Sequence, residues 1–135
     1  MTTKNRAVGW ASLAVGIAVG LVMGLWSFDG PMPAPHWIGE YTDTSRRLVR
    51  LGHIAFIGLG LLNILLDDEL KRSALRLTNR VLASRLMIAG NALLPVALIA
   101  AGAWRPIKYL LPLPALCIFG AMALAAWGAR TPPGS

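Results

Sequence analysis

Four long, uninterrupted runs of apolar residues dominate this chain of 135 residues. Each run is about 20 residues long, which as a helix covers the roughly 30 Å hydrocarbon core of a bilayer. Apolar residues make up 56% of the chain, and they lie in blocks instead of recurring at the spacing of a soluble amphipathic helix. The sequence therefore predicts an all-α integral membrane protein, a bundle of four transmembrane helices in a single domain.

The expected segments follow from where the apolar runs begin and end. The transmembrane helices are expected at about residues 7–28, 45–66, 82–104 and 109–128. A long outer loop, residues 29–44, is rich in proline and cannot begin as a helix. A tight turn at residues 105–108 makes the last two helices an antiparallel hairpin, and residues 129–135 are expected to be a disordered tail.

A charged segment separates the second helix from the third. Three acids, Asp67, Asp68 and Glu69, are expected to end the second helix, because carboxylates at a helix C-terminus oppose its dipole. In the segment that follows, about residues 69–80, apolar residues share one helical face and basic residues cover much of the rest. This pattern predicts a short amphipathic interfacial helix that lies on anionic lipids.

The net charge of +7 bears on partners and on orientation. In a membrane protein, Lys and Arg collect in cytoplasmic loops beside anionic head groups, so we expect no nucleic-acid partner. Eight basic residues lie in the N-terminus, the middle loop with the start of the third helix, and the tail, whereas five lie on the other side. The positive-inside rule then places both termini in the cytoplasm. The compact size and the charge bias favour the cell membrane, with a bacterial inner membrane as the expected host.

Small residues recur every four positions along the first helix. They are Ser12, Gly16, Gly20 and Gly24. Such a ladder forms a flat groove that another helix backbone can approach closely. The partner is either another helix of this chain, which we favour, or another subunit.

A few polar residues interrupt the second and third apolar runs. His53 and Asn63 lie near one face of the second helix, and Ser84 and Asn91 near one face of the third. Polar groups at membrane depth are costly unless they face protein, water or a ligand. If the two faces meet, these side chains form a polar seam, and interhelical hydrogen bonding is its simplest interpretation.

His53 also allows a metal or cofactor hypothesis, although none is expected in the favoured interpretation. An imidazole in a helical bundle is a suitable axial ligand for haem b. The other histidine, His36, lies in the outer loop and would have to fold back over the bundle to be a second ligand. Met23 and Met32 are thioether alternatives, and the two histidines with the two methionines could instead hold copper.

No catalytic motif is present in the sequence. There is no glycine-rich phosphate loop, no His-Glu-x-x-His and no Cys-x-x-Cys, and the single cysteine, Cys117, excludes an internal disulfide. We expect a protein that is not an enzyme but an accessory or interaction subunit of a larger membrane complex, with a membrane-protein partner or further copies of itself. The alternatives are a haem- or copper-binding electron-transfer or metal-handling protein and, third, a minimal oligomeric transporter.

Overall fold

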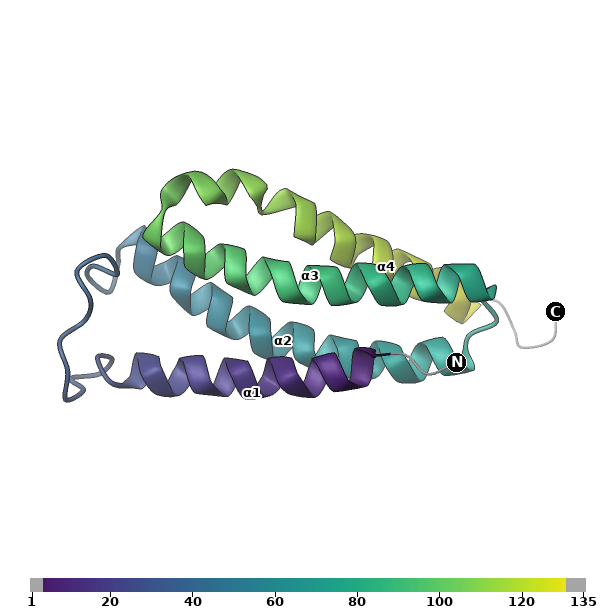
Figure 1. Ribbon diagram of the computed structural model, residues 1–135, viewed down its shortest axis with the longest axis horizontal. Coiled ribbons are helices and arrows are strands. Elements are labelled where there is room, and N and C mark those ends of the chain that lie inside the picture. Colours follow the sequence, from purple (N-terminus) through teal and green to yellow (C-terminus); the bar gives the residue numbers. More distant parts are fainter. Residues whose placement is uncertain (1–3, 131–135) are drawn as a thin grey trace.

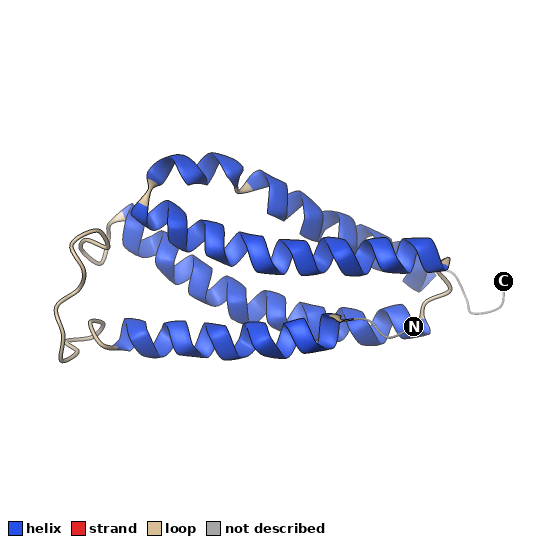
Figure 2. Cartoon of the chain, in the orientation of Figure 1, coloured by secondary structure: helices blue, strands red, loops and turns tan. Residues whose placement is uncertain are grey.

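The computed structural model describes residues 4–130, and across them the chain is helical apart from its turns and connections (Figures 1 and 2). The helices are α1 (Asn5–Gly24), α2 (Thr44–Arg72), α3 (Leu77–Ala103), the 3₁₀ helix η1 (Arg105–Leu110) and α4 (Pro112–Arg130). Four segments, namely α1, α2, α3 and Arg105–Arg130, are long and apolar enough to cross a membrane. The predicted all-helical architecture with four such segments is confirmed.

The helices run up and down beside one another. The pair α2 and α3 lies at the centre, with α1 packed mainly on α2 and α4 mainly on α3. At one end of the bundle lie η1 and the connection of residues 25–43, and we call this the long-loop end. At the opposite end, which we call the terminal end, lie the start of α1, the turn of residues 73–76 and the end of α4.

The apolar core is small, and much apolar surface faces outward. The core cluster lies toward the terminal end and consists of Leu59, Leu66, Leu70, Leu75, Ala83, Met87 and Ala121. Large apolar side chains on the outside of the helices are well exposed, for example Leu21 at 72% and Phe119 at 71%. Soluble monomers rarely expose contiguous apolar surface of this extent. The inside of the bundle, by contrast, holds several polar side chains.

Two glycines bring the backbones of α1 and α2 into contact. A Cβ atom added at Gly9 would lie 2.6 Å from the carbonyl oxygen of Gly60, and one added at Gly60 would lie 2.8 Å from that of Gly9. Real Cβ atoms do not approach a carbonyl oxygen this closely, so only glycine fits at either position. The small residues of the two helices thus set the distance between them.

Helix α1 ends at Gly24, four residues before the predicted end near residue 28. The residues that follow form a closed turn, in which the amide of Met32 donates to the carbonyl of Leu25 at 2.8 Å. Phe28 and Asp29 adopt left-handed φ angles of 51° and 60°. The last apolar residues of the run therefore reverse the chain instead of extending the helix, and the long connection begins at residue 25.

Helix α2 does not break at the three acids but continues to Arg72. Leu70 is wholly buried in the core cluster, which holds the last turn in helical form. Asp67 is also buried and pairs with Lys71 one turn later. Because Lys71 and Arg72 occupy the final turn, cations and not carboxylates meet the negative end of the helix dipole.

The separate interfacial helix predicted at residues 69–80 is not shown by the structure. Residues 69–72 belong to α2, residues 73–76 form an extended turn, and α3 begins at Leu77. In the turn, Leu75 is buried in the core, and Arg80 caps the turn by donating to the carbonyls of Leu75 and Ser73. Leu70 and Leu75 both enter the core, whereas Ala74 and Leu77 are exposed, so only part of the apolar surface of this segment is used inside the bundle.

The remaining boundaries differ less. Helix α3 begins five residues before the predicted start at residue 82, and the expected tight turn at residues 105–108 is the start of η1. Helix α4 begins at Pro112, where a missing amide hydrogen costs no helical hydrogen bond. Of the predicted tail, Ala129 and Arg130 are the last residues of α4, and residues 131–135 lie outside the described part of the chain.

Candidate ligand-binding site

A cavity of about 690 Å³ lies at the long-loop end between α1, α2 and the connection that joins them. Its volume falls within the range of about 300–1,000 Å³ that is typical of small-molecule sites. The lining residues are Gly20, Met23, Gly24, Trp26, Ser27, Phe28, Asp29, Tyr41, Arg46, Arg50, His53 and Ile54. Most of the wall is apolar, and the polar groups come mainly from the first turns of α2.

His53 is held in a defined orientation. Its Nδ1 lies 2.7 Å from the carbonyl oxygen of Gly16 on α1. Since a carbonyl can only accept, Nδ1 carries the proton and donates it, and Nε2 of the neutral ring keeps a free lone pair. Hydrogen bonding of one ring nitrogen to a backbone carbonyl is the arrangement that orients histidines that bind metals.

Gly20 makes room for the His53 ring. A Cβ atom at this position would lie 2.6 Å from Cε1 and 3.2 Å from Nε2 of the imidazole. The ring therefore rests edge-on against the backbone of α1, and both residues line the same cavity. Any larger residue at position 20 would displace the imidazole.

Arg46 and Arg50 bring positive charge to the cavity without a carboxylate partner. Arg46 makes long hydrogen bonds of 3.4 Å to the carbonyls of Gly39 and Trp26, and Arg50 donates to the carbonyl of Tyr41 at 3.2 Å. The Arg50 guanidinium also lies 4.2 Å from the centre of the Tyr41 ring. Over residues 4–130, the ion pair that the structure shows joins Asp67 and Lys71, far from this cavity. Both guanidinium groups thus keep donors and charge available for an anion.

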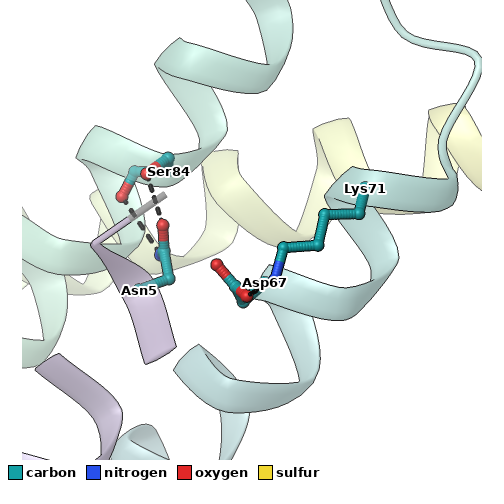
Figure 3. Close-up of polar contacts among 4 residues, drawn as sticks. All are labelled: Asn5, Asp67, Lys71 and Ser84. Atoms are coloured by element: carbon teal, nitrogen blue, oxygen red, sulfur yellow. Dashed lines mark hydrogen bonds and ion pairs between the residues drawn. The ribbon is translucent and has the colours of Figure 1, made fainter. Parts of the chain in front are cut away.

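The polar seam predicted from His53, Asn63, Ser84 and Asn91 is not one continuous line. Near the terminal end, Asn5 on α1 donates to Asn63 Oδ1 at 2.7 Å. Asn5 also accepts a hydrogen bond from the Ser84 hydroxyl (Figure 3). All three side chains are buried. This terminal cluster ties α1 to both central helices.

A second cluster lies nearer the middle of the bundle. The hydroxyl of Ser12 lies 2.7 Å from the carbonyl oxygen of Phe56 and 3.1 Å from Asn91 Oδ1. Between the two clusters, the Gly9 and Gly60 backbones are in contact, which leaves no room there for water. The seam is therefore a set of separate interhelical hydrogen bonds, and α1 contributes Asn5, Ser12 and the Gly16 carbonyl to it.

The small-residue ladder contacts α2. Gly16 lies against Phe56 and Ile57, and Gly20 lies against His53. Ser12 is buried. A Cβ atom added at Gly24 would meet nothing within 4 Å, and this glycine lines the cavity. The favoured assignment of the ladder to packing within the chain agrees with these contacts.

Of the four residues considered as haem or copper ligands, two line the cavity. Met23 and His53 both do, whereas His36 and Met32 are exposed in the long connection and do not. No group of three or more His, Cys, Asp or Glu residues that could hold a metal ion occurs among residues 4–130. The structure therefore does not bring together the four-residue copper set considered from the sequence.

Sequence reasoning missed the role of three residues at this site. In the sequence, Arg46 and Arg50 count only among the five basic residues on the side opposite the termini, and Tyr41 falls within the expected outer loop. A signal was present, because residues 46, 50 and 53 have the i, i+4, i+7 spacing that places side chains on one helical face. The spacing of two guanidiniums and an imidazole on one face could have indicated the site.

Comparison with known proteins gives no further guide: no family model, no curated protein and no solved structure matches this chain.

Proposed function

We propose that this chain is a small multi-pass protein of the cell membrane that binds an amphiphile with an acidic head group in the cavity at the long-loop end. The observation that carries this proposal is the pair Arg46 and Arg50, which face an apolar-walled cavity and have no carboxylate partner over residues 4–130. The proposed role is binding and not catalysis.

The composition of the cavity wall supports an amphiphilic ligand. Arginine side chains bind carboxylates and phosphates through paired hydrogen bonds. Asp29 is the acidic residue in the lining, and it is outnumbered by the two guanidiniums. Trp26, Phe28 and Ile54 provide apolar surface for a hydrophobic body. A ligand with an acidic end and an apolar body would therefore match both parts of the wall.

The exposed apolar surface of the helices supports insertion in a bilayer. The charge bias of the sequence supports cytoplasmic termini, which would place the cavity at the opposite, outer face of the membrane. Exposed bases at the terminal end, such as Lys71, Arg72 and Arg76, would then meet anionic lipid on the cytoplasmic side. In this orientation the ligand would enter from the outer leaflet.

A pair of ligands that differ only in the head group tests the proposal. The purified full-length protein in a neutral detergent is heated with a long-chain fatty acid or with the fatty alcohol of the same length. We expect the acid to raise the unfolding temperature, because ligand that binds only the folded state stabilises it, and the alcohol to have a much smaller effect.

Variants of the two arginines test whether the rise in unfolding temperature depends on the cavity. We expect Arg46→Gln with Arg50→Gln to abolish the shift caused by the acid. Arg47→Gln is the matched control, because Arg47 lies on the same helical turn and does not line the cavity. Equal shifts from acid and alcohol, or an undiminished acid effect in the double variant, would refute the proposal.

A role as an accessory subunit of a larger membrane complex, or in a homo-oligomer, is a separate hypothesis. The small-residue ladder was its main support, and Gly16 and Gly20 lie against α2 of the same chain. A partner would have to bind another surface.

A further inference from the structure

We infer that the acidic amphiphile is a haem, bound through its iron to His53 Nε2. This inference rests on the proposed function, because haem is a flat apolar molecule with two carboxylates on one edge. It adds a requirement that a fatty acid or lipid does not have, namely a nitrogen ligand for the iron at a suitable place in the same cavity.

The state of His53 meets that requirement. The bond from Nδ1 to the Gly16 carbonyl leaves Nε2 unprotonated in the neutral ring, which is the form that binds iron. The same bond fixes the ring, so little further ordering is needed on binding. Over residues 4–130, the structure shows no other hydrogen-bond partner of His53.

The cationic groups lie at a suitable distance from the imidazole along the helix. Arg50 precedes His53 by three residues and Arg46 precedes it by seven, which corresponds to about 5 Å and about 10 Å of helix rise. Both line the cavity with His53. Carboxylates at the edge of a macrocycle can therefore meet the two guanidiniums while the iron, at the centre of the macrocycle, meets the imidazole.

The wall formed by α1 suits a flat ring. Gly20 is covered by the imidazole of His53, whereas Gly24 offers backbone without a side chain and has open space around it. Met23 lies between them in sequence and lines the cavity, so its thioether is available as a second axial ligand. Methionine with histidine is an established axial pair for haem iron.

The test compares haemin with protoporphyrin IX, which has the same carboxylates and the same flat ring but no iron. Full-length protein, purified without haem in a neutral detergent, is titrated with each porphyrin and followed by absorption and by quenching of tryptophan fluorescence. We expect a 1:1 haemin complex with a shifted Soret band, and binding of protoporphyrin weaker by about tenfold or more because the iron–imidazole bond is missing.

Variants separate ligation from ion pairing. His53→Ala should reduce haemin affinity to that of protoporphyrin, and added imidazole should restore the Soret position by occupying the vacated site. Arg46→Gln with Arg50→Gln should weaken both porphyrins alike. His36→Ala is the matched control and should bind haemin as the native chain does, because His36 does not line the cavity.

The outcomes distinguish this inference from the proposed function. A haemin spectrum that His53→Ala leaves unchanged, or protoporphyrin that binds as tightly as haemin, would overturn the haem assignment. The proposed function would still stand if the fatty acid kept its dependence on Arg46 and Arg50. Loss of that arginine dependence for every acidic ligand would overturn the proposed function as well.

Discussion

Asp67 is the most unusual residue in the bundle, because a carboxylate with 1% exposure lies near the terminal end of α2. One of its oxygens pairs with the half-exposed Lys71, while the other, Oδ1, is buried without a hydrogen-bond partner over the described residues. Figure 3 draws Asp67 and Lys71 on one helix, together with the bonded pair Asn5 and Ser84. A buried charge with one unmade hydrogen bond depends strongly on its remaining partner.

We predict that removing the charge of Lys71 alone destabilises the bundle more than removing the charges of both Lys71 and Asp67. Lys71→Ala leaves the buried carboxylate without a counter-charge, and we expect a loss of about 1–3 kcal/mol in the free energy of unfolding. Asp67→Asn in the Lys71→Ala background removes the charge and should recover most of that loss. Unfolding of the full chain in mixed detergent micelles with increasing dodecyl sulfate measures both changes. A double variant no more stable than Lys71→Ala would contradict this account.

At the scale of residues, polarity within an apolar run was an informative signal. Asn63, Ser84 and Asn91 were singled out in this way, and all three are buried and hydrogen-bonded. The shared partner of Asn63 and Ser84 could not be predicted, because Asn5 lies at the edge of its apolar run, where water is the default partner. The burial of Asp67 was equally hidden, since burial depends on how the helices pack and not on the local sequence.

At the scale of elements, α1 and α2 pack closely because glycines, which have no side chain, lie where the two helices meet. The Gly9 and Gly60 backbones touch, and buried polar side chains are hydrogen-bonded on either side of that contact. Dispersion contacts and hydrogen bonds drive helix association where no hydrophobic force acts between helices. Both require the short distance that these glycines permit.

Two glycines on α2 offer a matched pair of substitutions. Gly60→Ala would place a Cβ against the backbone of α1, which cannot move aside, and we expect a loss of about 1–3 kcal/mol in the free energy of unfolding. Gly58→Ala meets nothing within 4 Å and should be neutral or should stabilise by up to about 1 kcal/mol, because alanine is the better helix former. The same dodecyl sulfate titration compares the two. Equal effects would show that the close contact does not control the packing of α1.

The identity of the four helices could be predicted from the sequence, whereas several of their ends could not. Apolar length alone identifies a segment that can span a bilayer. The ends of α2 and α3, however, depend on whether Leu70 and Leu75 enter the core or lie on a membrane surface. Amphipathic periodicity is the same in both cases, so only the tertiary packing separates them.

At the scale of the whole molecule, the charge bias of the sequence favours one orientation in a membrane, with both termini in the cytoplasm. The cavity and the terminal cluster lie at opposite ends of the bundle, so one orientation places the cavity outside the cell and the other places it inside. The leaflet from which the proposed ligand would enter depends on this orientation.

Cysteine labelling in cells tests the orientation. In a Cys117→Ala background, Thr42→Cys reports on the long-loop end and Thr78→Cys on the terminal end, and both positions are exposed. Neither substitution changes the charge that is expected to set the topology. We expect a membrane-impermeant maleimide to label Thr42→Cys in intact spheroplasts and Thr78→Cys only after lysis. The reverse pattern would place the cavity on the cytoplasmic side.

The dry contact between Gly9 and Gly60 has a consequence for the membrane that would hold this protein. A membrane that maintains a proton gradient loses it through any continuous chain of water molecules and polar groups that crosses the bilayer. Here the backbones of α1 and α2 touch at Gly9 and Gly60, between the two hydrogen-bonded clusters, so no water fits between the two helices at this level. The ligand site that we propose at one end of the bundle would then not continue as a polar path between α1 and α2 across a membrane.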